Sequence, residues 1–119
     1  MSTEKLIYKI LTREQWQTMQ QSGTLVGAPI DLQDGYIHFS TATQTSETLA
    51  KYFGAQSGLE LLEVSVDKVS ANLKWETSRN DQLFPHLYAK LQLDEVNRHW
   101  TLDLDSDGVH ILPPFGVTL

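Results

Sequence analysis

Hydrophobic and polar positions alternate along several short stretches of the chain, and alternation with a period of two predicts β-strands. The stretch 6–11 is apolar at nearly every position, with Lys9 as the exception, and predicts a first strand with both faces covered. Residues 59–66 give the clearest alternation, with three aliphatic side chains sharing one face. Further strands are expected at 36–40, 73–76, 84–91 and 99–104.

Two helices are predicted early in the chain from their start signals. Thr12 and Gln15 have the spacing of a capping box, and Gly23 is a typical residue at a helix C-terminus. Thr41 and Gln44 repeat the capping-box spacing and predict a second helix that begins at Thr41.

Residues 24–33 combine glycine, proline and scattered apolar side chains, and predict an irregular crossing loop. Near the C-terminus, residues 105–108 predict a tight turn and 109–112 the returning strand of a hairpin. Two helices followed by a run of strands indicate an α+β fold, with a mostly antiparallel sheet. We expect one domain over residues 1–119.

Composition and charge exclude several classes of function. The formal net charge of −6 disfavours broad nucleic-acid binding, because phosphate backbones repel an acidic chain. Without cysteine there are no disulfides, thiolate nucleophiles or thiolate metal sites, which suits a cytoplasmic protein. No window approaches the roughly 20 apolar residues of a membrane span, so no membrane association is expected.

A first candidate site lies where the strand at 36–40 leads into the second helix. On this strand His38 and Ser40 share the polar face, and Thr41 follows at the predicted helix start. A histidine, hydroxyls and free backbone N–H groups together suit an anion or a polar small molecule. The structural alternative is a satisfied histidine on a polar sheet face with Thr41 acting only as a cap, and spacing alone favours it.

A second candidate site combines the segment 75–79 with the strand at 84–91. Arg79 is suited to bind a phosphate or carboxylate through two N–H groups, and His86 follows nearby. Glu76 is a candidate acid or base, or a partner that orients Arg79 or a histidine. The alternative is a surface loop with an exposed arginine and core aromatic residues, and the sequence does not decide between them.

Metal sites are not expected. Residues 103–108 begin like a calcium-binding loop, but the twelfth position, which needs a glutamate, is Pro114. The four histidines show no close spacing of a metal motif.

Four sequence blocks resemble the domain of unknown function 952 family of small bacterial proteins. The blocks are Ile7-Tyr8-Lys9-Ile10 with Trp16 downstream, Asp34-Gly35-Tyr36-Ile37-His38-Phe39-Ser40-Thr41 with Gln44, Trp75-Glu76 and Phe84-Pro85-His86-Leu87-Tyr88. The resemblance implies a compact, split α+β sheet related to the ADP-ribosyltransferase fold. The block 37–40 is also similar to a run in RNA 2′-phosphotransferases, which share that fold.

The resemblance further implies a cleft for a phosphorylated, nucleotide-like ligand, with NAD or an ADP-ribose-like molecule as the expected cofactor. It places Ser40 and Thr41 at the cleft with His38 on the same strand, and His86 and Tyr88 on the opposite wall. Lys9 stands where the family usually has histidine, and a lysine binds phosphate as a point charge.

The leading hypothesis is therefore a ligand-binding cleft in which Lys9 and Arg79 supply charge and Trp75 packs against a ring. For an enzyme, the expected chemistry is glycosyl or ADP-ribosyl transfer or hydrolysis at an anomeric carbon, with Glu76 and His38 as the catalytic candidates. The competing hypothesis is a non-catalytic binding or protein-interaction module with a relic cleft. The sequence makes no prediction of oligomeric state.

Overall fold

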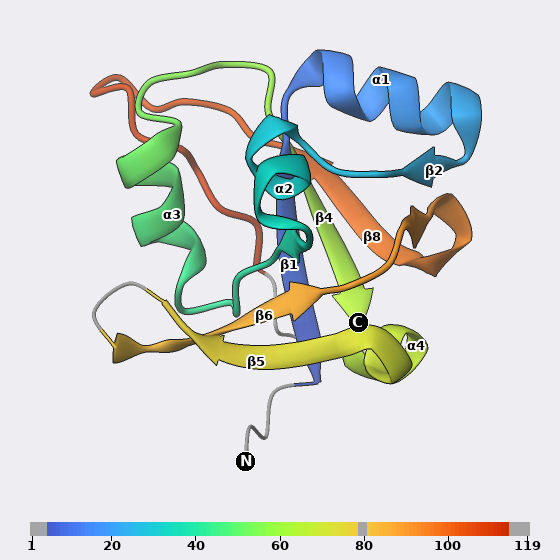
Figure 1. Cartoon of the computed structure of the whole chain (residues 1–119). Coiled ribbons are helices and arrows are strands. Elements are labelled where there is room, and N and C mark those ends of the chain that lie inside the picture. The colour runs from blue at the N-terminus through green and yellow to red at the C-terminus, as the bar shows by residue number, and fades with distance from the viewer. Residues whose placement is uncertain (1–4, 79–80, 115–119) are drawn as a thin grey trace.

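The computed structural model describes residues 5–78 and 81–114 and shows a mixed α/β fold with small antiparallel sheets (Figure 1). The first sheet has the strand order β1–β4–β8, from β1 (Leu6–Leu11), β4 (Glu60–Ser65) and β8 (Val96–Thr101). Both partners of β4 are antiparallel to it, and the strand is buried on both faces at nearly every position. The predicted strands at 6–11 and 59–66 are thus confirmed.

A second sheet, in the order β3–β6–β5, crosses below the first (Figure 1). Its strands are β3 (Ile37–His38), β6 (Leu83–Leu87) and β5 (Leu73–Thr77). The two sheets meet at β1, because Tyr8 and Ser40 exchange backbone hydrogen bonds of 2.8 and 2.9 Å. In the β3–β6 pair His38 lies directly opposite His86, so two distant segments bring their histidines together.

Helix α1 (Arg13–Ser22) has the predicted ends. The Thr12 side chain accepts a hydrogen bond from the Gln15 N–H at 3.2 Å, and the Gln15 side chain accepts from the Thr12 N–H at 2.9 Å. Gly23 ends the helix at φ 80°, in the left-handed region that glycine adopts without a steric cost. A capping box and a glycine C-cap are local signals, so the sequence was sufficient to find this helix.

The prediction of an irregular loop at 24–33 was wrong. Strand β2 (Thr24–Leu25) pairs with β7 (Leu91–Gln92), and helix α2 (Pro29–Asp34) follows it. Proline is favoured in the first turn of a helix because its missing N–H would have no helical partner there. The carboxylate of Asp31 completes the start by accepting a hydrogen bond from the Ala28 N–H at 2.8 Å.

The second predicted helix begins one turn later than expected. Helix α3 (Thr45–Tyr52) starts at Thr45, whereas Thr41 and Gln44 form a turn in which the Gln44 side chain accepts from the Thr41 N–H at 3.0 Å. A fourth helix, α4 (Val66–Val69), begins at the last residue of the predicted strand 59–66 and continues into the short 3₁₀ helix η1 (Ser70–Asn72). The described residues therefore contain four α-helices rather than the two predicted.

The later strands differ from prediction at their ends. Strand β6 stops at Leu87 instead of 91, and the 3₁₀ helix η3 (Leu93–Glu95) precedes β8. Strand β8 begins at Val96, and the predicted hairpin beyond it is reduced to a turn with a single bridge between Leu104 and His110. In the described ranges no helix is long and apolar enough to cross a membrane.

Candidate functional site

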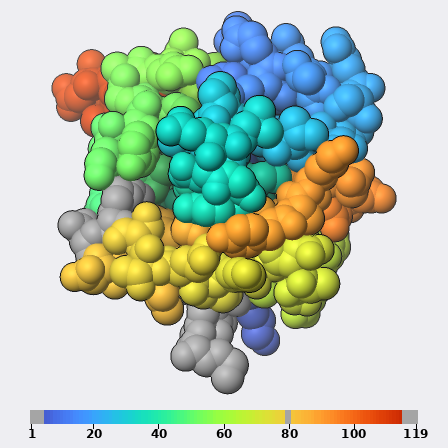
Figure 2. All heavy atoms as spheres, viewed as in Figure 1, coloured from blue at the N-terminus to red at the C-terminus, as the bar shows by residue number. Residues whose placement is uncertain are grey.

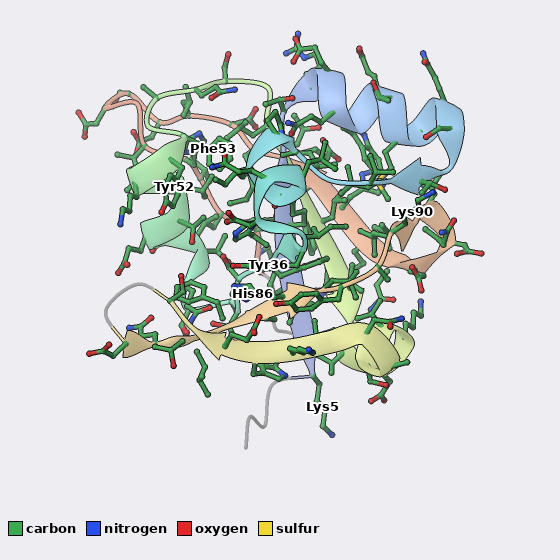
Figure 3. All side chains as sticks on the ribbon, viewed as in Figure 1. Lys5, Tyr36, Tyr52, Phe53, His86 and Lys90 are labelled. Atoms are coloured by element: carbon green, nitrogen blue, oxygen red, sulfur yellow. The ribbon has the colours of Figure 1, made fainter. Side chains whose placement is uncertain are left out.

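A cavity of about 460 Å³ opens between α2, α3 and strand β6. Aromatic side chains form much of its wall, namely Tyr36, Phe39, Tyr52, Phe53 and Phe84. Lys9, Asp34, His38, Ser40 and His86 supply its main polar groups. In the space-filling view α2 lies on the front face between α3 and β6 (Figure 2), and Figure 3 shows Tyr36 and His86 between α2 and β6. Apolar walls with a few convergent polar groups are typical of small-molecule sites.

The two histidines of the β3–β6 pair approach each other at this cavity. Their ring centroids are 5.5 Å apart, in an edge-to-face arrangement. The Tyr36 ring stacks on His86 with a centroid distance of 4.2 Å and is 4.7 Å from His38. Both imidazole rings therefore lie at the wall of this cavity, close to the Tyr36 ring.

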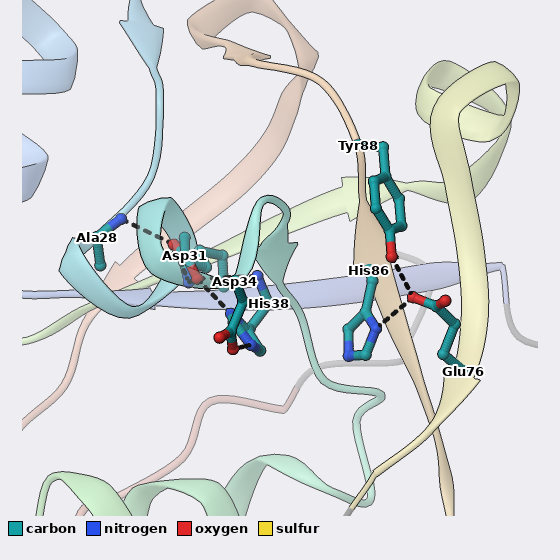
Figure 4. Close-up of polar contacts among 8 residues, drawn as sticks. Ala28, Asp31, Asp34, His38, Glu76, His86 and Tyr88 are labelled. Atoms are coloured by element: carbon teal, nitrogen blue, oxygen red, sulfur yellow. Dashed lines mark hydrogen bonds and ion pairs between the residues drawn. The ribbon is translucent and has the colours of Figure 1, made fainter.

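Asp31 is the hydrogen-bonding centre behind His38 (Figure 4). Its carboxylate is 1% exposed and lies 2.9 Å from the Lys9 ammonium. It also accepts from the His38 backbone N–H at 3.0 Å and contacts His38 Nδ1 at 2.6 Å. Burial raises the pKa of Asp31, but the His38 hydrogen bonds and the Lys9 charge outweigh burial and lower this pKa to about 2. Burial lowers the pKa of Lys9, and Asp31 partly offsets that effect.

His38 is held at both ring nitrogens. Nδ1 contacts Asp31, and Nε2 lies 3.0 Å from a carboxylate oxygen of Asp34. An ionised carboxylate only accepts hydrogen bonds. Of the forms that the imidazole ring can take, only the protonated one can therefore donate to both carboxylates at once. In this arrangement His38 is a fixed donor on one side of the cavity.

His86 is held on one side only. Its Nδ1 lies 2.8 Å from Oε1 of Glu76, and the Tyr88 hydroxyl donates to the same oxygen at 2.8 Å (Figure 4). The hydrogen bonds from His86 and Tyr88 lower the pKa of Glu76. The bond to Glu76 raises the pKa of Tyr88 to about 12. Glu76 is thus an ionised partner that orients His86.

The predicted site residues divide into three groups. Lys9, His38, Ser40 and His86 line the cavity, whereas Glu76 and Tyr88 stand behind His86. Trp75 packs against the main hydrophobic core, and the Thr41 hydroxyl contacts the Thr43 hydroxyl at 3.2 Å, so neither lines the cavity. Arg79 lies outside the described residues.

Sequence reasoning missed Asp31, Asp34 and Tyr36 as site residues. Pro29 followed by an acid at the third helical position was a usable signal for a helix start, and it would have placed Asp31 in a first turn. Its contact with Lys9 has no local signal, because 22 positions separate the two residues.

A smaller cavity of about 210 Å³ lies between α3 and the turn at 108–110. Among its lining residues His110 is the one titratable side chain, and the rest are mainly small or apolar. The larger cavity therefore has more titratable lining residues than the smaller one.

These features define a class of protein: a small mixed α/β fold with a cavity lined by histidines and aromatic residues where two antiparallel sheets meet. Residues 10–99 match the family described as "Protein of unknown function (DUF952)", and the chain belongs to that family.

Solved structures agree with this assignment. The crystal structure of protein CC0527 from Caulobacter crescentus is 47% identical, with a TM-score of 0.85, over 89% of this chain and 93% of that one. The solution NMR structure of the same protein is 48% identical, with a TM-score of 0.79, over 87% of this chain and 90% of that one. No curated protein matches the sequence.

Proposed function

We propose that the cavity is an ADP-ribosyltransferase-like cleft that binds a phosphorylated, nucleotide-like ligand such as NAD or ADP-ribose. The observation that carries this proposal is that His38 and His86, from separate segments, line one cavity of about 460 Å³. A cavity of this size lies within the usual range of roughly 300–1,000 Å³ for small-molecule sites.

The two ends of such a ligand would meet different parts of the cleft. A planar ring suits the aromatic wall around Tyr36, whose ring already stacks on His86. Lys9 and Asp31 neutralise each other, and Asp34 adds negative charge beside His38. We therefore place the ring in the cavity, and Arg79, which lies outside the described residues, stays the proposed partner of the phosphates from its chemistry alone.

The chemistry we assign to this cleft is transfer or hydrolysis at the anomeric carbon of the ligand. A carboxylate stabilises an oxocarbenium-like centre in such reactions. His38 lines the cavity and is the proposed catalytic residue, whereas Glu76, the carboxylate expected from the sequence, stands behind His86 and acts through it. Nicotinamide release from NAD tests this assignment. A signal that falls in Glu76→Gln supports it, and unchanged release would remove Glu76 from the role.

A thermal-shift screen tests binding itself. The screen uses NAD, ADP-ribose and short RNAs with a terminal phosphate, because a ligand that binds only the folded chain adds about 2.7 kcal/mol at 100 times its Kd. We expect NAD or ADP-ribose to raise the Tm, and His86→Ala to abolish the rise. His99→Ala is the matched control, since His99 also contacts a glutamate but does not line the cavity.

A second candidate function is a protein-interaction module, and exposed apolar side chains on and near α2 favour it. Val26, Ile30 and Leu32, on and just before α2, are each more than half exposed. Exposed apolar clusters often mark protein contacts. If no ligand raises the Tm while Leu32→Asp changes the oligomeric state measured by light scattering, the interaction function replaces the ligand-binding one.

A further inference from the structure

One ring nitrogen in the cavity differs from the others. His38 has a carboxylate at each nitrogen, and His86 has Glu76 at Nδ1. Within residues 5–78 and 81–114, Nε2 of His86 has no hydrogen-bond partner, although the side chain is only 4% exposed. Buried polar groups are nearly always paired, so an unpaired one on a cavity wall points to a ligand.

The hydrogen bonds behind His86 decide which nitrogen carries the proton. Glu76 is ionised, since its bonds from His86 and Tyr88 lower its pKa, and an ionised carboxylate offers acceptors only. Nδ1 must therefore donate to Glu76, and the neutral ring keeps its lone pair at Nε2. The carboxylate orients this histidine as carboxylates orient metal-binding and catalytic histidines.

Two further contacts fix the direction of that lone pair. The Tyr36 ring lies 22° from parallel to the His86 ring at 4.2 Å, and this stacking limits rotation of the imidazole. The Tyr88 hydroxyl donates to the same Glu76 oxygen as His86, which holds the carboxylate in place. A fixed acceptor on a cavity wall selects ligands by the donor that they present to it.

The charges around the cavity narrow the ligand class. Three carboxylates, those of Asp34, Asp31 and Glu76, lie at or beside the cavity, and Lys9 supplies positive charge against them. A neutral or cationic ring is favoured here over an anionic group, because the carboxylates repel an anion close to them.

We propose that His86 is the proton-accepting group of the cavity, that Glu76 is its positioning residue, and that the site selects a neutral or cationic ring bearing an O–H or N–H group directed at Nε2. The proposal rests on the proposed function only in requiring that a ligand ring enters this cavity. It adds the side of the ring that is recognised and the residue that receives its proton.

The position of the proton on the His86 ring tests the first half of this proposal, namely that Glu76 leaves Nε2 as the acceptor. Long-range ¹H–¹⁵N spectra distinguish a neutral histidine protonated at Nδ1 from one protonated at Nε2. We expect the Nδ1–H form for His86 in the wild type and in Glu76→Gln, whose amide oxygen still accepts, and loss of that form in Glu76→Ala. His99 is an internal reference, because its Nδ1 lies 2.6 Å from Glu60, far from Glu76 in sequence. Protonation of His86 at Nε2 in the wild type, or an unchanged spectrum in Glu76→Ala, would overturn the proposal.

A pair of small probes tests the second half. Phenol and anisole share a ring, but anisole has a methyl group in place of the hydroxyl proton. We expect phenol to move the His86 Nε2 signal progressively during titration and anisole to leave it in place, with His99 unaffected by either. Equal shifts with both probes, or no shift with phenol, would contradict donor selection by His86.

These outcomes are separable from those of the nucleotide screen. A phenol-specific shift without any nucleotide binding supports the acceptor role and rejects the nucleotide-like ligand. Nucleotide binding with His86 protonated at Nε2 keeps the proposed function and rejects His86 as the acceptor.

Discussion

Carboxylates that hold other side chains play different parts in the two sheets. In the β1–β4–β8 sheet, Glu63 accepts from Arg98 Nε at 3.0 Å and Nη2 at 2.8 Å, and from the Tyr8 hydroxyl at 3.0 Å. In the β3–β6–β5 sheet, Glu76 holds a histidine whose other nitrogen faces a cavity. The polar groups around Glu63 bond to one another within the protein, whereas Nε2 of His86, in the second sheet, is left available to a ligand.

Asp31 combines the structural role of Glu63 with the orienting role of Glu76. It satisfies the buried Lys9 in the manner of a structural ion pair, and it also orients His38 at the cavity. The comparison therefore predicts that substitutions of Asp31 and Glu63 act mainly on stability, whereas substitution of Glu76 acts mainly on the chemistry of His86.

The largest effect is expected for Asp31→Ala. The change leaves the Lys9 ammonium buried without its carboxylate and removes the partner of the Ala28 and His38 N–H groups. Breaking a buried ion pair costs about 3–5 kcal/mol, which urea unfolding would measure as a lower midpoint. Asp34→Ala on the same helix is the control, because that side chain is partly exposed and a small loss is expected. Equal losses in the two variants would contradict the central role of Asp31.

Glu63→Ala should have the next largest effect. The carboxylate is 2% exposed and receives three hydrogen bonds, whereas the Arg98 side chain is 26% exposed and is rehydrated when its partner is lost. We expect a loss of about 2–3 kcal/mol in the free energy of unfolding, below that of Asp31→Ala. Substitution of the exposed Asp94 by alanine is the control. A loss no greater than the control would show that this network contributes no net stability.

Acid should remove the contribution of Asp31. Its pKa is about 2 in the folded chain against 3.8 as the ordinary value, so the folded state favours the ionised form. The contribution is complete above about pH 4, falls as pH drops towards 2, and amounts to about 2 kcal/mol. Urea midpoints across this range should show the fall in the wild type and a smaller fall in Asp31→Asn. Parallel curves for the wild type and Asp31→Asn would contradict the assignment of this loss of stability to Asp31.

Thr12→Ala tests a purely local contact away from the cavity. The variant loses the side-chain acceptor for the Gln15 N–H at the start of α1. Loss of an N-cap costs about 1 kcal/mol, measurable by chemical unfolding. Thr12 does not line the cavity, so the ring spectra of His38 and His86 should not change, and a change in either would indicate that α1 is coupled to the cavity. His99 is left out of this comparison, because its ring centroid lies 4.7 Å from that of Trp16 on α1.

Glu76→Ala should have the smallest effect on stability. The carboxylate is partly exposed, so its loss should lower the unfolding midpoint less than Thr12→Ala does. The same variant should alter the His86 ring spectrum, which Thr12→Ala leaves unchanged. A large drop in stability would place Glu76 with Glu63 as a structural carboxylate and remove the contrast between the sheets.

The sequence predicted the parts of the fold that depend on neighbouring residues. The Thr12–Gln15 capping box, the Gly23 helix end and the alternation in β4 are all local, and all were found. The start of α3 was misplaced because Thr41 and Gln44 make the same side-chain contact in a turn as in a helix.

The sequence identified which residue types belong to the site, but it did not identify the role of each residue. His38 and His86 were identified on separate strands, and their pairing depends on the β3–β6 register, which no local pattern specifies. Glu76 was considered as an orienting partner, but its choice of His86 follows from the β5–β6 register. Asp31 was missed because the segment 24–33 was taken for an irregular loop and because its partner Lys9 lies 22 positions away.

The central claim is that His38 and His86 face one ligand-binding cavity. The most direct test is a long-range ¹H–¹⁵N spectrum of the histidine rings with and without saturating NAD. The account predicts that the signals of His38 and His86 move together while those of His99 and His110 stay in place. Four unmoved signals, or movement confined to His99 or His110, would contradict it.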